Sequence, residues 1–252
     1  MHRYIQIYKH KSKSRPVRHK QNEIRIIFSF IVPYRDRQEM IPGLIKNINK
    51  YYNNYEILII EQRNNKPFMR GQLCNLGYQR SIGKYVIFMD VDARFLYKID
   101  LVPKDRPMVM FTTVVQVKED GDKLIPLSES RRLSGFGLCT AFSRKQFEES
   151  NGFSNLPIGW GCEDNILHKR ANLIRMPHKM GHVWHGNIGW RGKTTKKALA
   201  NNRKILNAER NKDTSHDSYK HTTGVNEIKN VAHQYDYNRY IIYSFEDIEV
   251  NK

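Results

Sequence analysis

Two acidic motifs in this chain have the residue types and spacing that group-transfer chemistry needs. Asp90-Val91-Asp92 follows the apolar run from Tyr85 to Met89, so two carboxylates come at the end of a predicted buried strand, where they could meet a divalent cation. The second motif, Gly159-Trp160-Gly161-Cys162-Glu163-Asp164, leads into a helix-like segment. A carboxylate beside an aromatic side chain is a candidate general base. Together the motifs suggest metal-assisted group transfer.

Each motif also has an ordinary structural interpretation. Asp90 and Asp92 could be solvated acids at a strand end, and Glu163-Asp164 could complement the dipole and the free N–H groups of a helix N-terminus. His182 and His185 could be plain surface and core residues of a short strand. Trp160 is harder to explain by packing, because its two flanking glycines give up backbone order. The occurrence of all these groups in one chain favours a functional site.

The charge of the chain favours anionic partners. A formal net charge of +18 and a pI near 9.8 imply attraction to nucleic acid, an anionic membrane surface, nucleotide phosphates or an acidic glycan. Much of the excess lies in residues 9–20 and 191–204. No helix-turn-helix, zinc-finger or RNA-binding pattern is present, and the charges are not interleaved with aromatics as stacking platforms require. We therefore expect no nucleic-acid partner.

Targeting signals and cysteines predict a location. No apolar run is long enough to span a membrane, and the first twenty residues lack the apolar core of a signal peptide. The three cysteines are odd in number and lie in predicted core or motif segments, which favours a reducing compartment without structural disulfides. These features predict a soluble protein without an anchor, in the cytoplasm or in a virion or its host's cytoplasm.

The length and the apolar pattern predict a basic arm at residues 1–22 and a single α/β domain at residues 23–252. Strands and helices alternate in its first part, which is typical of a mostly parallel, Rossmann-like sheet flanked by helices. The expected strands are Ile26–Pro33, Tyr55–Glu61 and Tyr85–Met89, and the expected helices are Arg37–Tyr51 and Arg70–Ile82.

Three of these predicted strands end in polar groups that should meet in one crevice. Pro33-Tyr34-Arg35, Glu61-Gln62-Arg63 and Asp90-Val91-Asp92 all follow a strand, and ligands of parallel sheets collect at the carboxyl ends of the strands. Further along we expect a strand at Met108–Val117, helices at Ser143–Ser150 and Glu163–Ala171, a strand at His182–His185, and a flexible loop at 186–202.

The motifs resemble, in their order along the chain, those of the β-1,4-galactosyltransferases and their GT-A relatives, including N-acetylgalactosaminyltransferases. The matching blocks are Val32-Pro33-Tyr34-Arg35-Asp36-Arg37-Gln38-Glu39, Phe68-Met69-Arg70, Asp90-Val91-Asp92, Phe136-Gly137, Asn151-Gly152-Phe153, the Gly159–Asp164 motif, and His182-Val183-Trp184-His185. One Asp-x-Asp is weak support alone, whereas seven ordered blocks over roughly residues 26–190 are strong.

This resemblance implies a single GT-A domain and a metal-dependent, inverting transfer of a hexose or N-acetylhexosamine, with Gal or GalNAc favoured. The sugar would pass from a UDP-sugar to a hydroxyl of a glycan or glycoconjugate acceptor, forming a β-glycosidic bond. The cofactor would be Mn2+, with Mg2+ possible because His182 stands where many relatives carry a Met. The alternatives are a catalytically inactive sugar-binding protein, a polyanion- or nucleic-acid-binding protein, and a glycan polymerase module.

The resemblance also implies roles for individual residues. Asp164 would be the catalytic base, Glu163 would orient hydroxyl groups, and Trp160 would fold over the sugar, with 186–197 as a closing lid. The other implied groups hold the nucleotide and the metal. Uridine and diphosphate would be bound by Pro33, Tyr34, Arg35, Arg37, Phe68 and Arg70, ribose or donor sugar by Asp90, and the metal by Asp92, His185 and His182.

Two positions depart from the family pattern and leave the donor sugar open. Leu138 stands where relatives have a second glycine, and Gly135 stands where galactose-selective relatives carry a large side chain that crowds an N-acetyl group. A small residue at 135 leaves room for UDP-GalNAc. The sequence leaves the acceptor and the oligomeric state open as well.

Overall fold

The computed structural model describes residues 26–132, 135–159, 161–185 and 195–211, Gly224, and four short segments at 228–229, 233–237, 240–245 and 249–250. The predicted arm at residues 1–22 lies outside these described residues. The helices are η1 (Gln38–Met40), α1 (Ile41–Tyr51), α2 (Arg70–Arg80), α3 (Arg144–Glu149), α4 (Glu163–Ala171) and α5 (Lys196–Asn211). None of the described helices is long and apolar enough to cross a membrane.

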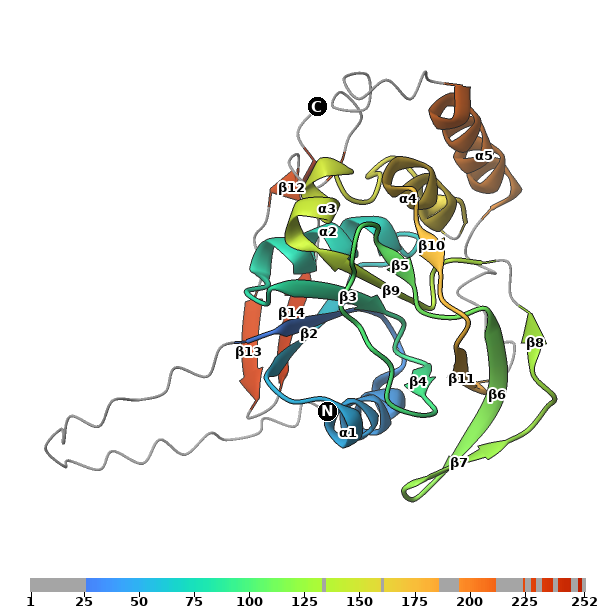
Figure 1. Ribbon diagram of the computed structural model, residues 1–252. Helices are drawn as coiled ribbons and strands as arrows, with labels where there is room; N and C mark the ends of the chain where they lie inside the picture. The colour runs from blue at the N-terminus through green and yellow to red at the C-terminus, as the bar shows by residue number, and fades with distance from the viewer. Residues whose placement is uncertain are drawn as a thin grey trace, which may run out of the picture.

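Strands of two larger sheets and one small one make up the rest of the fold (Figure 1). The large sheet contains β1 (Phe28–Tyr34), β2 (Tyr55–Gln62), β3 (Tyr85–Met89), β5 (Met108–Val109), β9 (Cys139–Ser143), β10 (Ile174–Arg175), β13 (His233–Tyr237) and β14 (Tyr240–Phe245). The second contains β4 (Ala93–Phe95), β6 (Thr113–Asp120), β7 (Lys123–Pro126), β8 (Arg131–Arg132) and β11 (Lys179–Val183), and β12 (Ile228–Lys229) pairs with β15 (Glu249–Val250).

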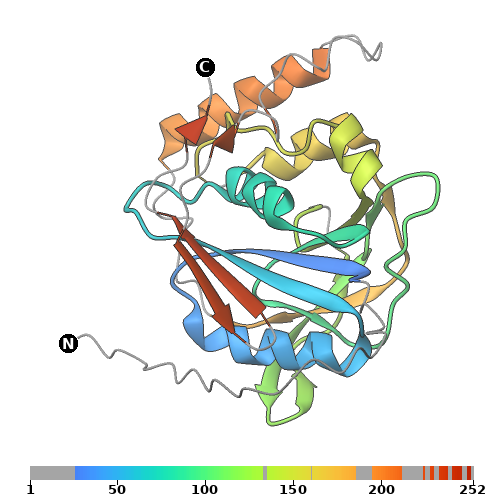
Figure 2. The same cartoon turned by 90° about the vertical axis from the view of Figure 1, so that its left-hand side faces the viewer.

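The centre of the large sheet confirms the predicted α/β architecture. Its order is β10-β5-β9-β3-β1-β2-β14-β13, and the run β3-β1-β2-β14 is parallel, while β9 and β13 join it antiparallel. Helices α1 and α2 cover opposite faces of this sheet (Figures 1 and 2). The sheet is therefore mixed at its edges and parallel where the crossover helices connect it.

Burial explains why these segments form strands and helices. β1 and β2 are almost fully buried, as expected of continuous apolar runs at the centre of a parallel sheet. Helix α1 is amphipathic and buries Ile41, Leu44 and Ile48, with a proline in its first turn. Helix α3 begins at Ser143 with a capping box in which the Ser143 side chain and the Gln146 side chain satisfy each other's backbone N–H groups.

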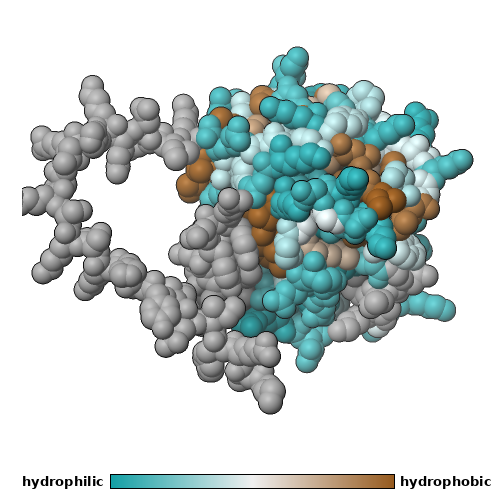
Figure 3. All heavy atoms as spheres, turned by 90° about the horizontal axis from the view of Figure 1, so that it is seen from below, coloured by the Kyte–Doolittle hydropathy of each residue, from teal (hydrophilic) through white to brown (hydrophobic). Residues whose placement is uncertain are grey.

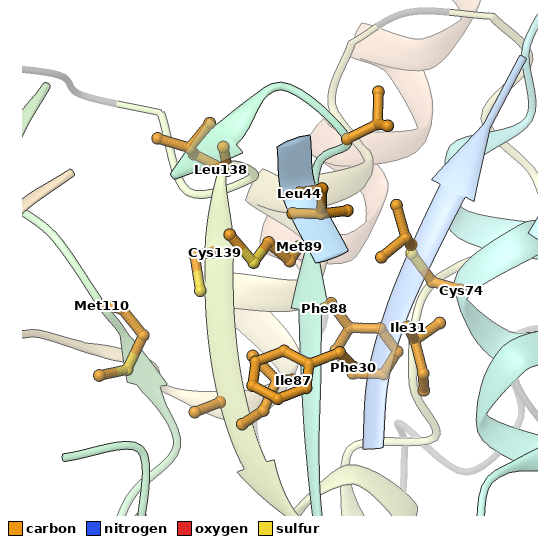
Figure 4. Close-up of a cluster of buried hydrophobic side chains, with 14 of the residues drawn as sticks. Phe30, Ile31, Leu44, Cys74, Ile87, Phe88, Met89, Met110, Leu138 and Cys139 are labelled. Carbon is orange, nitrogen blue, oxygen red and sulfur yellow. The ribbon is translucent and has the colours of Figure 1, made fainter. Parts of the chain in front are cut away.

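Figure 4 shows a cluster of buried apolar side chains around the central strands. Phe30 and Ile31 of β1, Leu44 of α1 and Phe88 of β3 are each 0% exposed. The face of the molecule in Figure 3 is mainly hydrophilic with scattered apolar groups, which is ordinary for a protein surface. Cys74 and Cys139 are buried, and Cys162 is partly buried.

Two sequence predictions about single segments are wrong. The strand expected at Met108–Val117 is two strands, β5 and β6, in different sheets. The hydrogen-bonding partner of the chain changes between them: the Met110 N–H donates to the Cys139 carbonyl in β9, whereas the Thr112 N–H donates to the His178 carbonyl just before β11. The flexible loop expected at 186–202 is wrong for residues 196–202, which belong to helix α5 (Lys196–Asn211). Residues 186–194, and so most of the expected lid, lie outside the described residues.

Candidate active site

The turn Asp90–Asp92 joins the two sheets, because β3 enters it from the large sheet and β4 leaves it into the second sheet. Backbone hydrogen bonds fix the turn on both sides. The Asp90 N–H donates to the Leu138 carbonyl at 3.1 Å, and the Val183 N–H donates to the Asp92 carbonyl at 2.8 Å. The site therefore forms where β3, β4 and β11 come together.

Strand β11 brings two histidines to Asp92. His182 lies opposite Ala93 in the β4–β11 pairing, and the Nε2 atoms of His182 and His185 lie 3.5 and 3.2 Å from Asp92 Oδ2. Arg37 donates from Nη1 to the same carboxylate oxygen. Burial alone would raise the pKa of Asp92, but its hydrogen bonds with both histidines and the Arg37 charge hold that pKa well below its usual range. The cluster thus keeps a carboxylate ionised between two imidazoles.

These three side chains fit a divalent cation. Each offers one ligand atom, and the three atoms lie within 4.8 Å of one another. Asp92 is only 4% exposed, yet its Oδ1 atom has no hydrogen-bond partner among the described residues. A buried carboxylate oxygen without a donor is unfavourable unless another group, such as a cation, meets it. One carboxylate and two imidazoles are a common ligand set for transition metals.

A second group of side chains lies at the carboxyl ends of β1 and β2. Tyr34 is buried as the last residue of β1, and the Arg35 guanidinium lies 5.4 Å from the centre of the Phe68 ring. Arg35 donates from Nη1 to the Lys66 carbonyl at 2.6 Å. The Nη2 atoms of Arg35 and Arg37 are buried without a partner among the described residues. Two such donors, with an aromatic ring beside Arg35, suit an anionic ligand that carries a planar group.

Arg70 contacts both acidic motifs. It is the first residue of α2 and is 8% exposed, and its guanidinium bridges two carboxylates: Nε lies 2.9 Å from Asp90 Oδ1 and Nη1 lies 2.7 Å from Asp164 Oδ1. Nη2 donates to the Gly137 carbonyl. Burial raises the pKa of Asp90 to about 6, with Arg70 opposing the shift and Asp92 and Asp164 adding to it. Arg70 thus holds the two acidic motifs together.

Glu163 and Asp164 begin helix α4 and differ in exposure. The Asp164 side chain is 26% exposed, and its Oδ2 atom lies against Gly137. Glu163 is 5% exposed and accepts a hydrogen bond from the Gly161 N–H at 3.0 Å. Burial, followed by the Asp164 charge, raises the pKa of Glu163 to about 8. Asp164 is therefore the accessible carboxylate of the pair, and Glu163 is the buried one.

The segment before β9 is fixed by stacking. The Phe136 ring lies 4.1 Å from the His168 ring in a stacked arrangement, and the Arg175 guanidinium lies 4.3 Å from the Phe136 centroid. Arg175 also donates to the Gly135 carbonyl at 2.9 Å. The Leu138 side chain is 6% exposed and belongs to the hydrophobic core. The two unusual positions of this segment thus differ, since Gly135 is on the surface and Leu138 is inside.

Two amide side chains also shape the site: Gln62, which the sequence placed at a strand end, and Asn202, which sequence reasoning missed. Gln62, at the end of β2, donates to the Pro67 carbonyl at 3.1 Å and accepts from the Met69 N–H at 2.9 Å, and so holds the loop before Arg70. Asn202 of α5 is fully buried and bonds the N–H and carbonyl of Ile158, both at 3.0 Å, and the carbonyl of Gly161 at 3.1 Å. Trp160 lies outside the described residues.

The arrangement of sheets and helices in this chain is the GT-A glycosyltransferase fold. A variant of the Drosophila β1,4-galactosyltransferase 7 catalytic domain, solved in complex with manganese, UDP-Gal and xylobiose, superposes with a TM-score of 0.61 over 89% of this chain and 94% of that one, at 19% identity. That likeness establishes the fold.

The chain belongs to the glycosyl transferase group 7 family. The model of the N-terminal region of glycosyl transferase group 7 matches residues 8–112, and the model of the N-terminal domain of galactosyltransferase matches residues 126–184, together more than half of the chain. This confirms the family resemblance read from the sequence motifs.

Curated relatives are similar to this chain over part of their length. Human beta-1,4-galactosyltransferase 4 is 32% identical over 157 residues, 59% of this chain and 43% of that protein. A beta-1,4-N-acetylglucosaminyl-transferase of Lymnaea stagnalis is 29% identical over 163 residues, 63% of this chain and 32% of that protein. The match spans less than half the length of either relative.

The predicted location is wrong. The sequence predicted a soluble cytoplasmic or virion-associated protein, whereas the relatives are β-1,4-galactosyltransferases, typically membrane-anchored enzymes of the Golgi. The prediction rested on the lack of an apolar segment in a chain that matches less than half of these proteins, and such a lack does not determine a compartment.

Proposed function

We propose that this protein is a metal-dependent, inverting glycosyltransferase that moves a hexose or N-acetylhexosamine from a UDP-sugar to an acceptor hydroxyl. The observation that carries the proposal is a set of three buried atoms without partners among the described residues: Asp92 Oδ1 and the Nη2 atoms of Arg35 and Arg37. A carboxylate oxygen calls for a cation and two guanidinium groups call for an anion. A metal-bound diphosphate supplies both.

The nucleotide would lie at the carboxyl ends of β1 and β2. Pro33 and Tyr34 end β1, and Phe68 with the Arg35 guanidinium beside it offers a surface for a base or a phosphate. Arg37 already contacts Asp92, so it is placed to bind the diphosphate next to the cation. Asp90 is partly exposed beside Asp92 and could accept from a sugar hydroxyl.

The cation would be held by Asp92, His182 and His185. When bound, it supplies Lewis-acid stabilisation of the charge that develops on the departing UDP. Mn2+ suits a carboxylate with two imidazoles, and Mg2+ is a second candidate because both histidines are harder ligands than a thioether. The similar Drosophila enzyme was solved with manganese and UDP-Gal, which supports the same pairing here.

Asp164 would act as the general base. Its Oδ1 atom is held by Arg70, while Oδ2 lies against Gly137 in a side chain that is partly exposed. Glu163 is a poor candidate for that role because its raised pKa of about 8 keeps it protonated at neutral pH. A protonated, buried Glu163 can instead orient a hydroxyl or the loop at Gly161.

The proposed reaction is a single displacement at C1 of the donor sugar. The acceptor oxygen attacks C1 of the donor sugar, the bond from C1 to the UDP oxygen breaks, and the acceptor proton passes to Asp164. Attack from the face opposite UDP inverts C1 and gives a β-linked product. The basic side chains Arg35 and Arg37 would stabilise the charge on UDP.

Gal or GalNAc is the proposed donor sugar, and the acceptor would be a glycan or glycoconjugate. Similarity to β-1,4-galactosyltransferases supports Gal, and the small Gly135 supports room for an N-acetyl group. The Lymnaea relative, named as an N-acetylglucosaminyl-transferase, favours testing UDP-GlcNAc as well.

The test is UDP release from UDP-Gal, UDP-GalNAc, UDP-Glc and UDP-GlcNAc, with Mn2+, Mg2+ or a chelator, and with simple glycosides as acceptors. Metal-dependent release with one preferred donor is the expected result. If no donor turns over and UDP does not bind with either metal, the transferase proposal is wrong, and a sugar-binding or polyanion-binding role takes its place.

A further inference from the structure

Among the residues that the structure describes, Arg94 is the largest fully buried side chain, and it lies in β4 two residues after Asp92. Its side chain is 0% exposed. A buried guanidinium is strongly unfavourable unless it is paired and hydrogen-bonded, so its partners indicate why the chain keeps it there.

The partners of Arg94 lie on both sides of Asp92. Nη1 donates to the carbonyls of Val91 and Ala93, each at 2.8 Å. Nη2 donates to the carbonyl of Met40 at 3.0 Å, and Nε donates to Glu119 Oε1 at 2.6 Å. One side chain therefore holds the carbonyl groups of the two residues that flank Asp92 in the sequence.

The same contacts connect the three segments that meet at Asp92. Met40 ends η1, three residues after Arg37, whose guanidinium contacts the Asp92 carboxylate. Glu119 belongs to β6, the strand paired with β11, which carries His182. Arg94 thus ties the Asp90–Asp92 turn to the segment that supplies the arginine and to the sheet that supplies the histidine.

The counter-charge of Arg94 is itself held in place. A Cβ atom built on Gly43 of α1 would overlap both carboxylate oxygens of Glu119, so the carboxylate lies directly against this turn of the helix. Glu119 therefore lies between Arg94 and the Gly43 backbone, although its side chain is 29% exposed. The Arg94–Glu119 ion pair thus lies between helix α1 and the second sheet.

We propose that Arg94, with Glu119, is a positioning residue that sets Asp92 for cation binding. The inference rests on the proposed function, because it takes Asp92, His182 and His185 as the cation ligands. Arg94 touches neither the cation nor the substrate in this account. It acts through the backbone of Val91 and Ala93, and loss of such outer partners typically weakens metal affinity about 10–100-fold.

A purely structural role for Arg94 would be to anchor β4, and the chain offers a matched control for that. Asn47 of α1 is buried and anchors the next residue of the same strand: its Nδ2 donates to the Phe95 carbonyl at 2.9 Å, and its Oδ1 accepts from the Phe95 N–H at 2.7 Å. Asn47→Ala therefore loosens β4 without touching the peptides around Asp92.

The experiment is a Mn2+ titration of the full chain in saturating UDP, followed by the electron paramagnetic resonance signal of free Mn2+. Wild type, Arg94→Met and Asn47→Ala are compared at a temperature where circular dichroism shows each to be folded. We expect Arg94→Met to bind Mn2+ at least tenfold more weakly than wild type, and Asn47→Ala to bind within about twofold of wild type. If Arg94→Met does not fold, Arg94→Lys, which keeps the charge but reaches fewer of the four acceptors, replaces it with the same expectation.

Equal Mn2+ affinity in the Arg94 variant and wild type would overturn the inference, and so would equal weakening in the Arg94 and Asn47 variants. Both results leave the proposed transferase intact. A wild-type protein that binds no Mn2+ with UDP would instead overturn the cation site itself, and the inference with it.

Discussion

Gly137→Ala is the substitution that should separate catalysis from folding most cleanly. Gly137 is not among the glycines with positive φ, so its backbone accepts alanine without strain. Its carbonyl, which accepts from Arg70, is kept. The only new group is a methyl, and it would overlap the Asp164 carboxylate, with Oδ2 as the nearest atom.

The size of the effect follows from this overlap. The Asp164 carboxylate has to retreat by roughly 1 Å to restore van der Waals contact, and a misplacement of that size costs about 100-fold in rate. This corresponds to about 2.7 kcal/mol in the activation free energy. UDP binding should stay unchanged, because Arg35 and Arg37 follow β1, whereas Gly137 precedes β9.

The assay is steady-state transfer with the preferred donor, together with calorimetry of UDP and Mn2+ binding. Gly121→Ala is the control, since Gly121 lies at the β6–β7 turn with nothing within 4 Å of a built Cβ. Its positive φ makes alanine mildly destabilising there, without a route to the site. A Gly137→Ala enzyme with wild-type kcat would refute the assignment of Asp164 as the base.

Two further substitutions test other parts of the site. Asn202→Ala removes three buried hydrogen bonds to Ile158 and Gly161, so we expect a lower Tm and a kcat reduced about tenfold. Asn201→Ala, on the exposed side of the same helix, is the control and should change neither value. Equal effects of the two substitutions would contradict a role for Asn202. Glu163 has a pKa raised to about 8, so its protonated form stabilises the fold fully below about pH 4.5, and this contribution is lost as the pH rises through 8. The Tm of Glu163→Gln, measured from pH 5 to 8, should therefore fall by roughly 5 °C less than that of wild type, and parallel profiles would show that the raised pKa is wrong.

The central strands and the acidic motifs could be predicted because continuous apolar runs end in polar groups. β3 and α4 were predicted with the bounds observed, since Tyr85–Met89 is uniformly apolar and the helix start at Glu163 is marked by acids. Family resemblance then supplied the roles that the residues alone left open. The parallel core follows from the alternation of these segments.

The remaining features depend on contacts between distant segments. The resemblance assigned Arg70 to the nucleotide, and only the fold shows that it bridges Asp90 and Asp164. Arg94 has no motif that marks it in the sequence, and only the fold shows that it bonds the carbonyls of Val91 and Ala93. Helix α5 was missed because its residues are mostly polar and follow a Gly- and Lys-rich stretch. The break between β5 and β6 was hidden because Met110 and Phe111 continue the apolar run.

The most direct test of the account compares wild type with Asp164→Asn in a single turnover of donor and acceptor, after binding of UDP and Mn2+ has been measured for both. Asn is nearly isosteric and can still accept a hydrogen bond from Arg70, but it cannot take a proton. The account predicts unchanged binding of UDP and Mn2+ and a transfer rate lowered by at least 100-fold. Transfer at the wild-type rate by Asp164→Asn would contradict it.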